Sequence, residues 1–397
     1  MQIEKGIDKL VKTVRMMILD KPGYFAKVAT AVGNAGGSLG DIKLVGYGLE
    51  YNTRDVTIFL DSEAQLQAVL EEVGKVEGVI ISDIIDPVLE MHRGGKIIVT
   101  SRNKVDSIST VRKIYTPGVA KVCTLIQRNP ELVYDYTAIF NTVAIVTNGT
   151  AILGLGDIGA VAGMPVMEGK AALFAALVGI NGVPILIQSK DSEEIIRTVA
   201  SIAPTFGAIK LEDIKSPECF EIEDRLSAML DIPVLHDDQH GTSVVVLAAL
   251  LNASQYVGMQ VKDETVGMVG LGAAGIGISK LLMAYGVRKM VGCDINPVAQ
   301  AIFAKVGGKP VSLAEVMASS DIVIATTGVP GLIKKEMIRK GQVILALSNP
   351  NPEISTEDAR AGGLRSRRTA GGSTTRSRSP GCSGGLSTRG RARSTTG

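Results

Sequence analysis

Two pairs of adjacent acids each follow a short apolar run that has the composition of a strand. Asp237 and Asp238 follow IPVL within the stretch IPVLHDDQHGT, and Glu212 and Asp213 follow GAIK. The carboxyl ends of parallel strands meet at one edge of an open α/β sheet, where such domains form their sites. We therefore expect the two pairs to converge, and a cation would relieve their repulsion. All-oxygen ligation is what Mg²⁺ or Mn²⁺ prefers.

Two other interpretations of these acids remain open from the residues alone. His236 and His240 have the spacing of two zinc ligands on one face of a helix, although the glutamate of an HExxH motif is absent. Alternatively, the acids cap helices that begin near Ser216 and Gly241.

A glycine-rich turn with the pattern GxGxxG occurs twice, at residues 154–159 (GLGDIG) and 270–275 (GLGAAG). The second copy follows the apolar run ETVGMV, opens a long helical pattern, and precedes an acid at the end of the next strand, which is the full dinucleotide-binding context. The expected binding residues are Gly270, Gly272, Ala273, Ala274, Gly275 and Asp294. An aspartate at the ribose repels a 2′-phosphate, so this pattern favours NAD over NADP, with NADP as the alternative.

The elements that position these residues are those of an α/β protein. Residues 13–88 read as strand, helix, strand, strand, helix, strand, the ferredoxin-like order. Helices and β-branched strands then alternate, which predicts an α/β substrate and metal domain over 96–258, with strands such as AIVTNGTAIL. The same alternation predicts a doubly wound, Rossmann-type NAD domain with a parallel sheet over 259–355.

The segment 356–397 has a different composition from the rest. It is rich in Arg, Ser, Thr and Gly with few large apolar residues, which predicts disorder. The segment after Asp358 contains nine arginines and no acid, so the chain before it carries a net charge of about −7. We hypothesise that this tail results from a reading-frame slip; the alternative is a basic arm that binds nucleic acid or lipid.

Composition limits the cellular setting. The four cysteines are far apart and show no paired spacing, which indicates neither a disulfide framework nor a zinc knuckle. The N-terminus lacks the apolar core of a signal peptide, and the longest near-apolar run is interrupted by Lys280 and glycines. We expect a cytoplasmic protein without a membrane span, and the body of the chain shows no nucleic-acid face.

Residues 13–88 resemble an ACT domain, a module that binds amino acids and similar effectors. The resemblance depends on Asp20, Pro22, Gly23, Gly36 and Gly37. It implies an effector site in this domain and a homodimer or larger oligomer.

Six motifs in order between residues 102 and 354 resemble the short bacterial type of malic enzyme: KIYTPGVAKVC, NGTAILGLGDIGAVAGMPVMEGKAALF, LEDIKSPECFEIEDRL, IPVLHDDQHGT, GLGAAGIG and ALSNPNPEI. The resemblance implies oxidation of (S)-malate by a nicotinamide cofactor with a divalent metal, followed by decarboxylation to pyruvate and CO₂. It places metal ligands at Glu212, Asp213 and Asp238, a neighbour that tunes the site at Asp237, a base at Lys170, an acid at Tyr115, and a malate or nicotinamide contact at Asn349.

The chemistry sets one further expectation. A free lysine has a pKa of about 10.4, whereas a working base needs about 7 to 8. We therefore expect burial and a nearby cation to lower the pKa of Lys170.

Two other functions stay open. The tail replaces a family segment that closes over malate, so the chain could be an impaired product that binds nucleotide and effector without turnover. Alternatively, it could be an ACT-linked amino-acid dehydrogenase, which has no use for an acid cluster.

Overall fold

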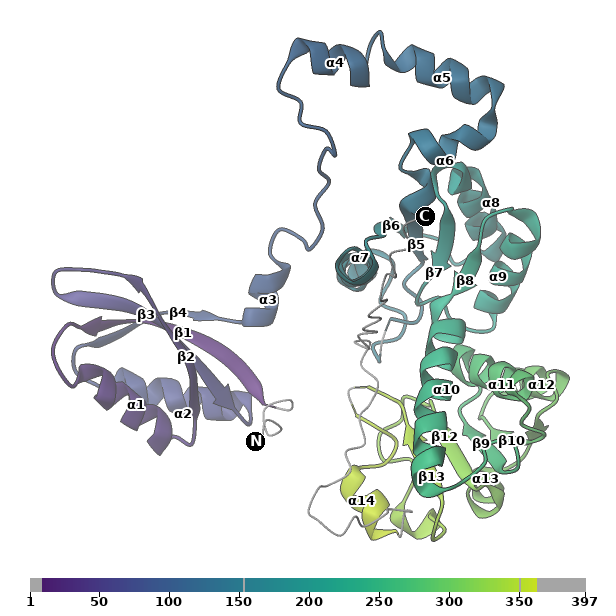
Figure 1. Ribbon diagram of the computed structural model, residues 1–397. Helices are drawn as coiled ribbons and strands as arrows, with labels where there is room; N and C mark the ends of the chain where they lie inside the picture. Colours follow the sequence, from purple (N-terminus) through teal and green to yellow (C-terminus); the bar gives the residue numbers. More distant parts are fainter. Residues whose placement is uncertain (1–8, 153, 350, 363–397) are drawn as a thin grey trace, which may run out of the picture. The chain divides into compact units, whose positions relative to one another are not determined.

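The computed structural model describes residues 9–152, 154–349 and 351–362 (Figure 1). It divides between Ile98 and Val99 into two compact units. The second unit contains two parallel sheets.

The N-terminal unit has one antiparallel sheet with two helices on a single face (Figure 1). Its elements are β1 (Leu10–Leu19), α1 (Tyr24–Asn34), β2 (Ser38–Gly46), β3 (Tyr51–Leu60), α2 (Glu63–Gly74), β4 (Val79–Ile85) and α3 (Pro87–His92). The sheet order β2-β3-β1-β4 is the ferredoxin-like order that the sequence predicts. Val14, Met16 and Ile18 of β1 are buried because alternate residues of a strand face the helices.

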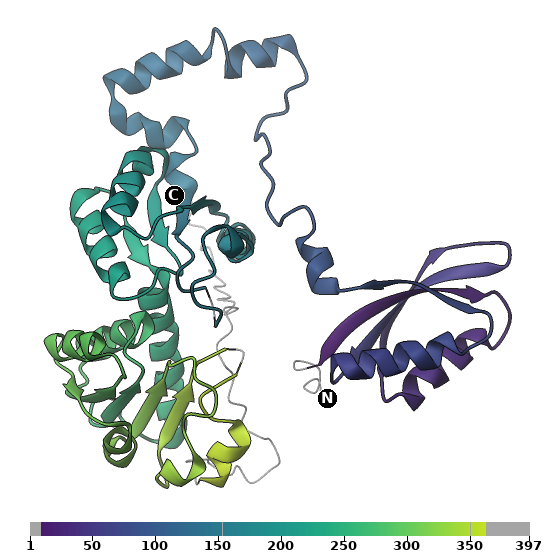
Figure 2. The same cartoon turned by 180° about the vertical axis from the view of Figure 1, so that it is seen from behind.

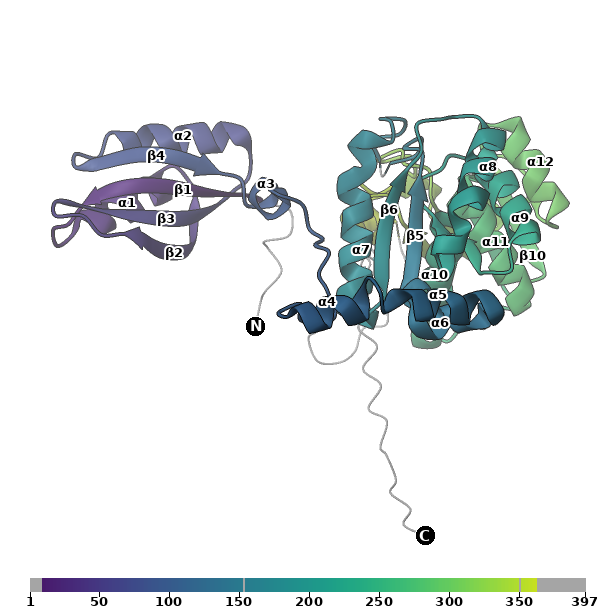
Figure 3. The ribbon, with the colours of Figure 1, turned by 90° about the horizontal axis from the view of Figure 1, so that it is seen from above.

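The first parallel sheet carries the acid pairs at its strand ends. The second unit begins with α4 (Ile108–Ile114), α5 (Val119–Arg128), α6 (Val133–Tyr136), β5 (Thr142–Thr147), α7 (Met164–Val178), β6 (Asn181–Leu186), α8 (Ser192–Ile202), β7 (Ala208–Leu211), α9 (Glu218–Met229), β8 (Val234–His236) and α10 (Asp237–Val257). The strand order is β6-β5-β7-β8. Figure 3 shows α7 on one side of β5 and β6, with α8 and α9 on the other.

The second parallel sheet has the strand order of a dinucleotide-binding domain. Its elements are β9 (Thr265–Val269), α11 (Ala273–Tyr285), β10 (Lys289–Cys293), α12 (Pro297–Lys305), β11 (Lys309–Pro310), α13 (Leu313–Ser319), β12 (Ile322–Ala325), β13 (Val343–Ala346) and α14 (Thr356–Ala361). The order β11-β10-β9-β12-β13 reverses direction at β9, which is the Rossmann arrangement. Helix α10 runs from the first sheet to the second (Figure 2), where Val246 and Leu250 join the core.

Two expectations about elements are wrong. The predicted strand AIVTNGTAIL ends at Thr147, because Gly149 turns the chain with φ +72° and its N–H donates to Thr147 Oγ1. The predicted tail is helical at its start, since Ser355 caps α14 by accepting a hydrogen bond from the Asp358 N–H. The disorder predicted for residues 363–397 lies outside the described residues.

Helix α7 is apolar and poorly covered. Together with the short turn before it, Val161–Val178 is long and apolar enough to span a membrane, and 17% of this window is buried. Length and composition alone are weak evidence for a membrane span. The helix packs on the first sheet through Met167 and Ala171 and carries the charged Lys170, so we interpret it as part of the α/β unit.

Candidate active site

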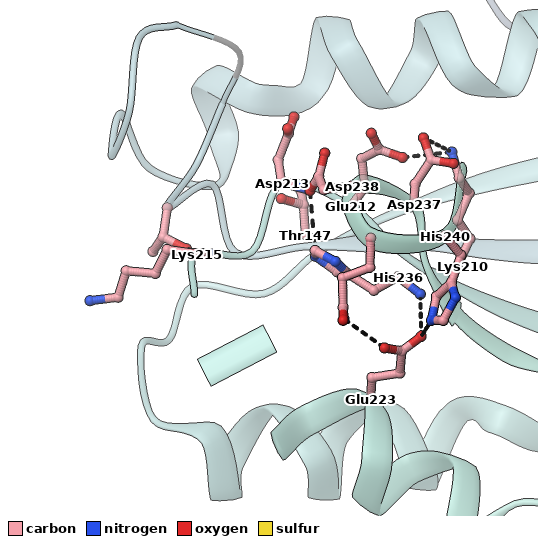
Figure 4. A network of polar contacts seen from close by, with 12 residues as sticks. Thr147, Lys210, Glu212, Asp213, Lys215, Glu223, His236, Asp237, Asp238 and His240 are labelled. Atoms are coloured by element: carbon pink, nitrogen blue, oxygen red, sulfur yellow. Dashed lines mark hydrogen bonds and ion pairs between the residues drawn. The ribbon is translucent and has the colours of Figure 1, made fainter. Parts of the chain in front are cut away.

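The two acid pairs converge at the carboxyl ends of β7 and β8 (Figure 4). Glu212, Asp213 and Asp238 each offer one carboxylate oxygen, and these oxygens lie within 4.8 Å of one another. Glu212 and Asp213 are buried, and Asp238 is half-buried. Three carboxylate oxygens at this spacing, two of them from buried residues, fit a hard divalent cation.

The backbone of Asp213 links the two strand ends. Its φ of +53° lies in the left-handed region, which is unusual for a residue other than glycine. The Asp213 N–H donates to Asp238 Oδ2 at 3.1 Å, and the Asp213 carbonyl accepts from the Ala151 N–H at 3.0 Å. These two bonds hold the turn after β7 against both α10 and the loop after β5.

Two lysines, Lys170 and Lys210, each form ion pairs with the same two acids, Glu212 and Asp237. Lys170 Nζ is 2.7 Å from Asp237 Oδ2 and 3.1 Å from Glu212 Oε1. Lys210 Nζ is 2.6 Å from Glu212 Oε2 and 3.1 Å from Asp237 Oδ2. Lys210 is not among the site residues predicted from the sequence. The available signal was a lysine inside the apolar run GAIKL, since a charge in a buried parallel strand needs a partner.

The charges in the cluster are strongly perturbed. Burial raises the pKa values of Glu212 and Asp238. Burial also opposes the charge of Asp237, but Lys210 and Lys170 outweigh it and hold the pKa of Asp237 below its usual value. Burial likewise opposes the charge of Lys170, yet Glu212 and Asp237 raise its pKa above the usual value. Two carboxylates hold the ammonium here, and the lowering expected from burial together with a bound cation stays a prediction.

The histidines do not join the metal-type cluster. His240 Nε2 is 2.8 Å from Glu223 Oε1, on the opposite side of the strand ends from the acids (Figure 4). Among the residues that the structure describes, the potential metal cluster contains carboxylates only. The geometry therefore does not support the zinc interpretation.

The capping interpretation fails as well. Helix α9 begins after Pro217 and α10 after His236, and neither start has a side-chain cap hydrogen bond within the described part of the chain. Asp237 and Asp238 do lie in the first turn of α10, where the helix dipole favours acids. That effect does not account for the convergence with Glu212 and Asp213.

The second glycine-rich turn has the geometry that its sequence predicts. Gly270 has φ +95°, which suits glycine, and a side chain on Gly275 would collide with the Gly270 carbonyl. Gly272 has only Ser216 Oγ near its missing Cβ, at 3.9 Å, so the backbone is open to a ligand there. Ala273 and Ala274 begin α11, whose N-terminus favours phosphate.

Asp294 follows β10 and lies beneath this turn. Its Oδ2 accepts from the Leu271 N–H at 2.7 Å, and its Oδ1 accepts from the Asn296 N–H at 2.8 Å. Asp294 therefore stabilises the glycine-rich turn by hydrogen bonds. The sequence does not predict this structural role. Each carboxylate oxygen has a further lone pair, so these bonds leave capacity for ribose hydroxyls.

Asn349 and Tyr115 lie outside the acid cluster. Asn349 is exposed, three residues after β13 ends. Nearby, the fully buried Glu353 ties two loops together by accepting from the Thr327 N–H at 2.6 Å and from Ser348 Oγ at 2.5 Å. Glu353 is not among the residues predicted from the sequence, because the run NPNPEI contains no evident signal for it.

Tyr115 lies directly after α4 and is 68% exposed.

Comparisons with known proteins agree with this geometry. Residues 96–193 and 187–227 match the family model "Malic enzyme, N-terminal domain". NAD-dependent malic enzyme 1 of Bacillus subtilis (strain 168) is 52% identical over 352 residues, covering 88% of this chain and 80% of that protein. The chain belongs to the malic enzyme family. Among its relatives, the NAD-dependent malic enzyme of Geobacillus stearothermophilus is 43% identical over 87% of this chain and 75% of that protein.

Structural comparison agrees with the malic enzyme assignment. The crystal structure of the NAD-dependent malic enzyme from Thermotoga maritima matches with a TM-score of 0.66 and 39% identity, covering 70% of this chain and 79% of that one. Residues 230–340 match the model "D-isomer specific 2-hydroxyacid dehydrogenase, NAD binding domain", which supports a nicotinamide cofactor. Membership of the malic enzyme family makes the chain an oxidoreductase, and it replaces the alternative of an amino-acid dehydrogenase.

Proposed function

We propose that this chain oxidises (S)-malate with NAD and decarboxylates the product to pyruvate and CO₂, using Mg²⁺ or Mn²⁺. The observation that carries the proposal is the convergence of Glu212, Asp213 and Asp238 on one point beside Lys170. Ser216 Oγ lies close to Gly272, so the turn after β7 adjoins the dinucleotide turn. A hydroxy-acid at the acid cluster would thus lie near a nicotinamide.

The proposed metal ligands are Glu212, Asp213 and Asp238. A bound divalent cation supplies Lewis-acid polarisation of the malate C2 oxygen in both the oxidation and the decarboxylation. Asp237 is held by two ammonium groups instead, which suits it to orient Lys170 and to tune the charge of the site.

Lys170 is the proposed base that takes the C2 hydroxyl proton while hydride leaves C2 for the nicotinamide. For this it must be neutral, and its contacts with Glu212 and Asp237 oppose the neutral form. A cation that binds Glu212 would weaken the contact of Glu212 with the Lys170 ammonium and so lower the pKa of Lys170. Metal binding should therefore favour the neutral, basic form of Lys170. Tyr115 is the proposed acid that protonates the carbon left by CO₂.

The proposed cofactor residues are Gly270, Gly272, Ala273, Ala274, Gly275, Asp294 and Asn349. Asp294 favours NAD because its carboxylate repels a 2′-phosphate, and NADP is the weaker alternative. Asn349 is the proposed contact with malate or the nicotinamide.

The proposed setting is a cytoplasmic homodimer or larger oligomer with an ACT-type effector domain. Ile108, Val111 and Ile114 of α4 are exposed apolar residues, and α5 buries none of its residues in the described chain. A second copy covering these helices would remove that apolar surface from water. We also propose three domains: the ACT-type domain at 13–88, the substrate and metal domain at 96–258, and the NAD domain at 259–355.

The test is malate-dependent NADH formation by the purified chain with Mn²⁺, repeated after EDTA treatment and with amino acids in place of malate. We expect malate turnover that EDTA abolishes and Mn²⁺ restores. Asp238→Asn should lose turnover, whereas Asp231→Asn, an exposed acid before β8, should keep it. NADH binding without turnover would favour the impaired product, and turnover insensitive to EDTA would contradict the metal site.

A further inference from the structure

A fully buried histidine lies directly before the second acid pair. His236 ends β8, and its side chain is 0% exposed. Neither ring nitrogen has a hydrogen-bond partner among the described residues. Leaving a buried polar group unsatisfied costs about 1–3 kcal/mol, so its presence calls for a physical reason.

The polar neighbour of this ring is a carboxylate of the acid cluster. His236 Nε2 lies 3.4 Å from Asp238 Oδ2 (Figure 4). The same oxygen accepts the Asp213 N–H at 3.1 Å. The Asp213 N–H and the His236 ring thus approach one oxygen of Asp238 from different strand ends, and among the described residues only the Asp213 N–H is hydrogen-bonded to it.

Glu223 of α9 holds the histidine in place. Its Oε1 accepts from the His236 backbone N–H at 2.7 Å, and its Oε2 accepts from Gln239 Nε2 at 2.7 Å. His240 Nε2 is 2.8 Å from Oε1. One buried carboxylate therefore fastens the backbone at the end of β8 to the first turn of α10.

We propose that His236 is a positioning residue: its Nε2–H, which faces Asp238 Oδ2 at 3.4 Å, becomes a hydrogen-bond donor to that oxygen when the carboxylate binds a divalent cation, and so orients it. The inference rests on the proposed metal role of Asp238. Groups that hydrogen-bond a metal ligand from behind fix its orientation, and their loss costs about 10- to 100-fold in metal affinity. This role accounts for the burial of the ring beside Asp238 and for its unpartnered Nε2.

The first test measures Mn²⁺ binding directly, by the loss of the free Mn²⁺ electron paramagnetic resonance signal, without substrate or cofactor. His236→Leu removes the donor and should raise the Kd by about 10- to 100-fold. His236→Gln keeps a donor near the Nε2 position and should recover most of the affinity. His92→Gln, an exposed histidine of the N-terminal unit, should leave the Kd unchanged and is the matched control.

The outcomes separate this inference from the proposed function. If the unmodified chain and His92→Gln bind no Mn²⁺, the metal site itself is wrong. If they bind and His236→Leu binds equally well, the positioning role is wrong. If His236→Gln recovers the Mn²⁺ affinity that His236→Leu loses, the loss is due to the missing hydrogen-bond donor and not to a disturbed core.

A second test requires no substitution. The chain has three histidines, so ¹⁵N-histidine labelling resolves the ring of each by long-range proton–nitrogen correlation. We expect a neutral His236 with its proton on Nε2, and a chemical-shift change of that ring when Mg²⁺ is added. A ring protonated on Nδ1 alone, or one indifferent to Mg²⁺, overturns the inference even if His236→Leu fails to fold.

Discussion

The clearest test of the dinucleotide turn is Gly275→Ala. A Cβ at residue 275 would collide with the Gly270 carbonyl oxygen and would lie 3.0 Å from the Gly270 carbonyl carbon. Both atoms belong to the backbone, so no side chain can rotate away. Gly270 itself is fixed by its N–H, which donates to the Cys293 carbonyl at 2.9 Å. The substitution must therefore separate α11 from the turn after β9.

The size of the effect follows from two opposing contributions. Overpacking of a buried site costs about 1–3 kcal/mol, and a backbone clash places this case at the upper end. Alanine regains about 1 kcal/mol over glycine within a helix. The net loss of about 2 kcal/mol corresponds to a fall in Tm of about 4–8 °C for a unit of this size.

The assay compares Gly275→Ala with Gly272→Ala, using thermal unfolding and NADH fluorescence titration. A Cβ on Gly272 meets no atom closer than 3.9 Å and the residue has φ −69°, so Gly272→Ala should leave Tm within about 2 °C. It should still weaken NADH binding about tenfold, because the pyrophosphate approaches the backbone there. Gly275→Ala should lose both stability and binding. Unchanged Tm and affinity in Gly275→Ala would refute the reasoning.

Three further results are expected. Lys170→Ala should lower kcat by about 10²- to 10⁴-fold in steady-state assays while Mn²⁺ still binds, and a full rate would remove Lys170 from the base role. Asp294→Ala should raise the Kd for NADH in fluorescence titration, because the Leu271 N–H loses its acceptor, and an unchanged Kd would contradict the bracing role. Arg15 holds the pKa of Asp55 below its usual value by a paired hydrogen bond. That contribution is present above about pH 4, the unfolded pKa of an aspartate, and is lost as pH falls through the lowered pKa. Urea unfolding should therefore show Asp55→Asn less stable by about 1 kcal/mol at pH 7, with the difference shrinking as the pH falls below 4.

Part of the fold and site could be predicted because it follows from local rules. Asp238 and Glu212 each follow an apolar strand, and parallel strands end at one edge, so their convergence follows from the alternation of elements. Gly270 and Gly275 are recognisable for a similar reason, since backbone geometry demands glycine at those positions.

Other parts depend on side-chain partners far away in the chain. The contacts of Lys210 and Glu223 are set by how α9, β7 and α10 pack, and no spacing in the sequence encodes them. The end of the predicted strand at Thr147 depends on one local hydrogen bond that competes with the apolar pattern. The contacts of Lys170 with Glu212 and Asp237 could not be predicted either, because these two acids follow different strands.

The close contact between α10 and α11 has a consequence for protein engineering. A Cβ on Gly277 would lie 2.5 Å from the Gln239 carbonyl oxygen, so the helix that carries Asp238 touches the dinucleotide helix backbone to backbone. A chimera that joins the first part of one homologue to the NAD-binding part of another at residue 258 would take α10 from one parent and α11 from the other. Their contacting surfaces would then not be matched. Swapping coenzyme modules between homologues should therefore succeed more often when the crossover lies upstream of β8, so that both helices are inherited together.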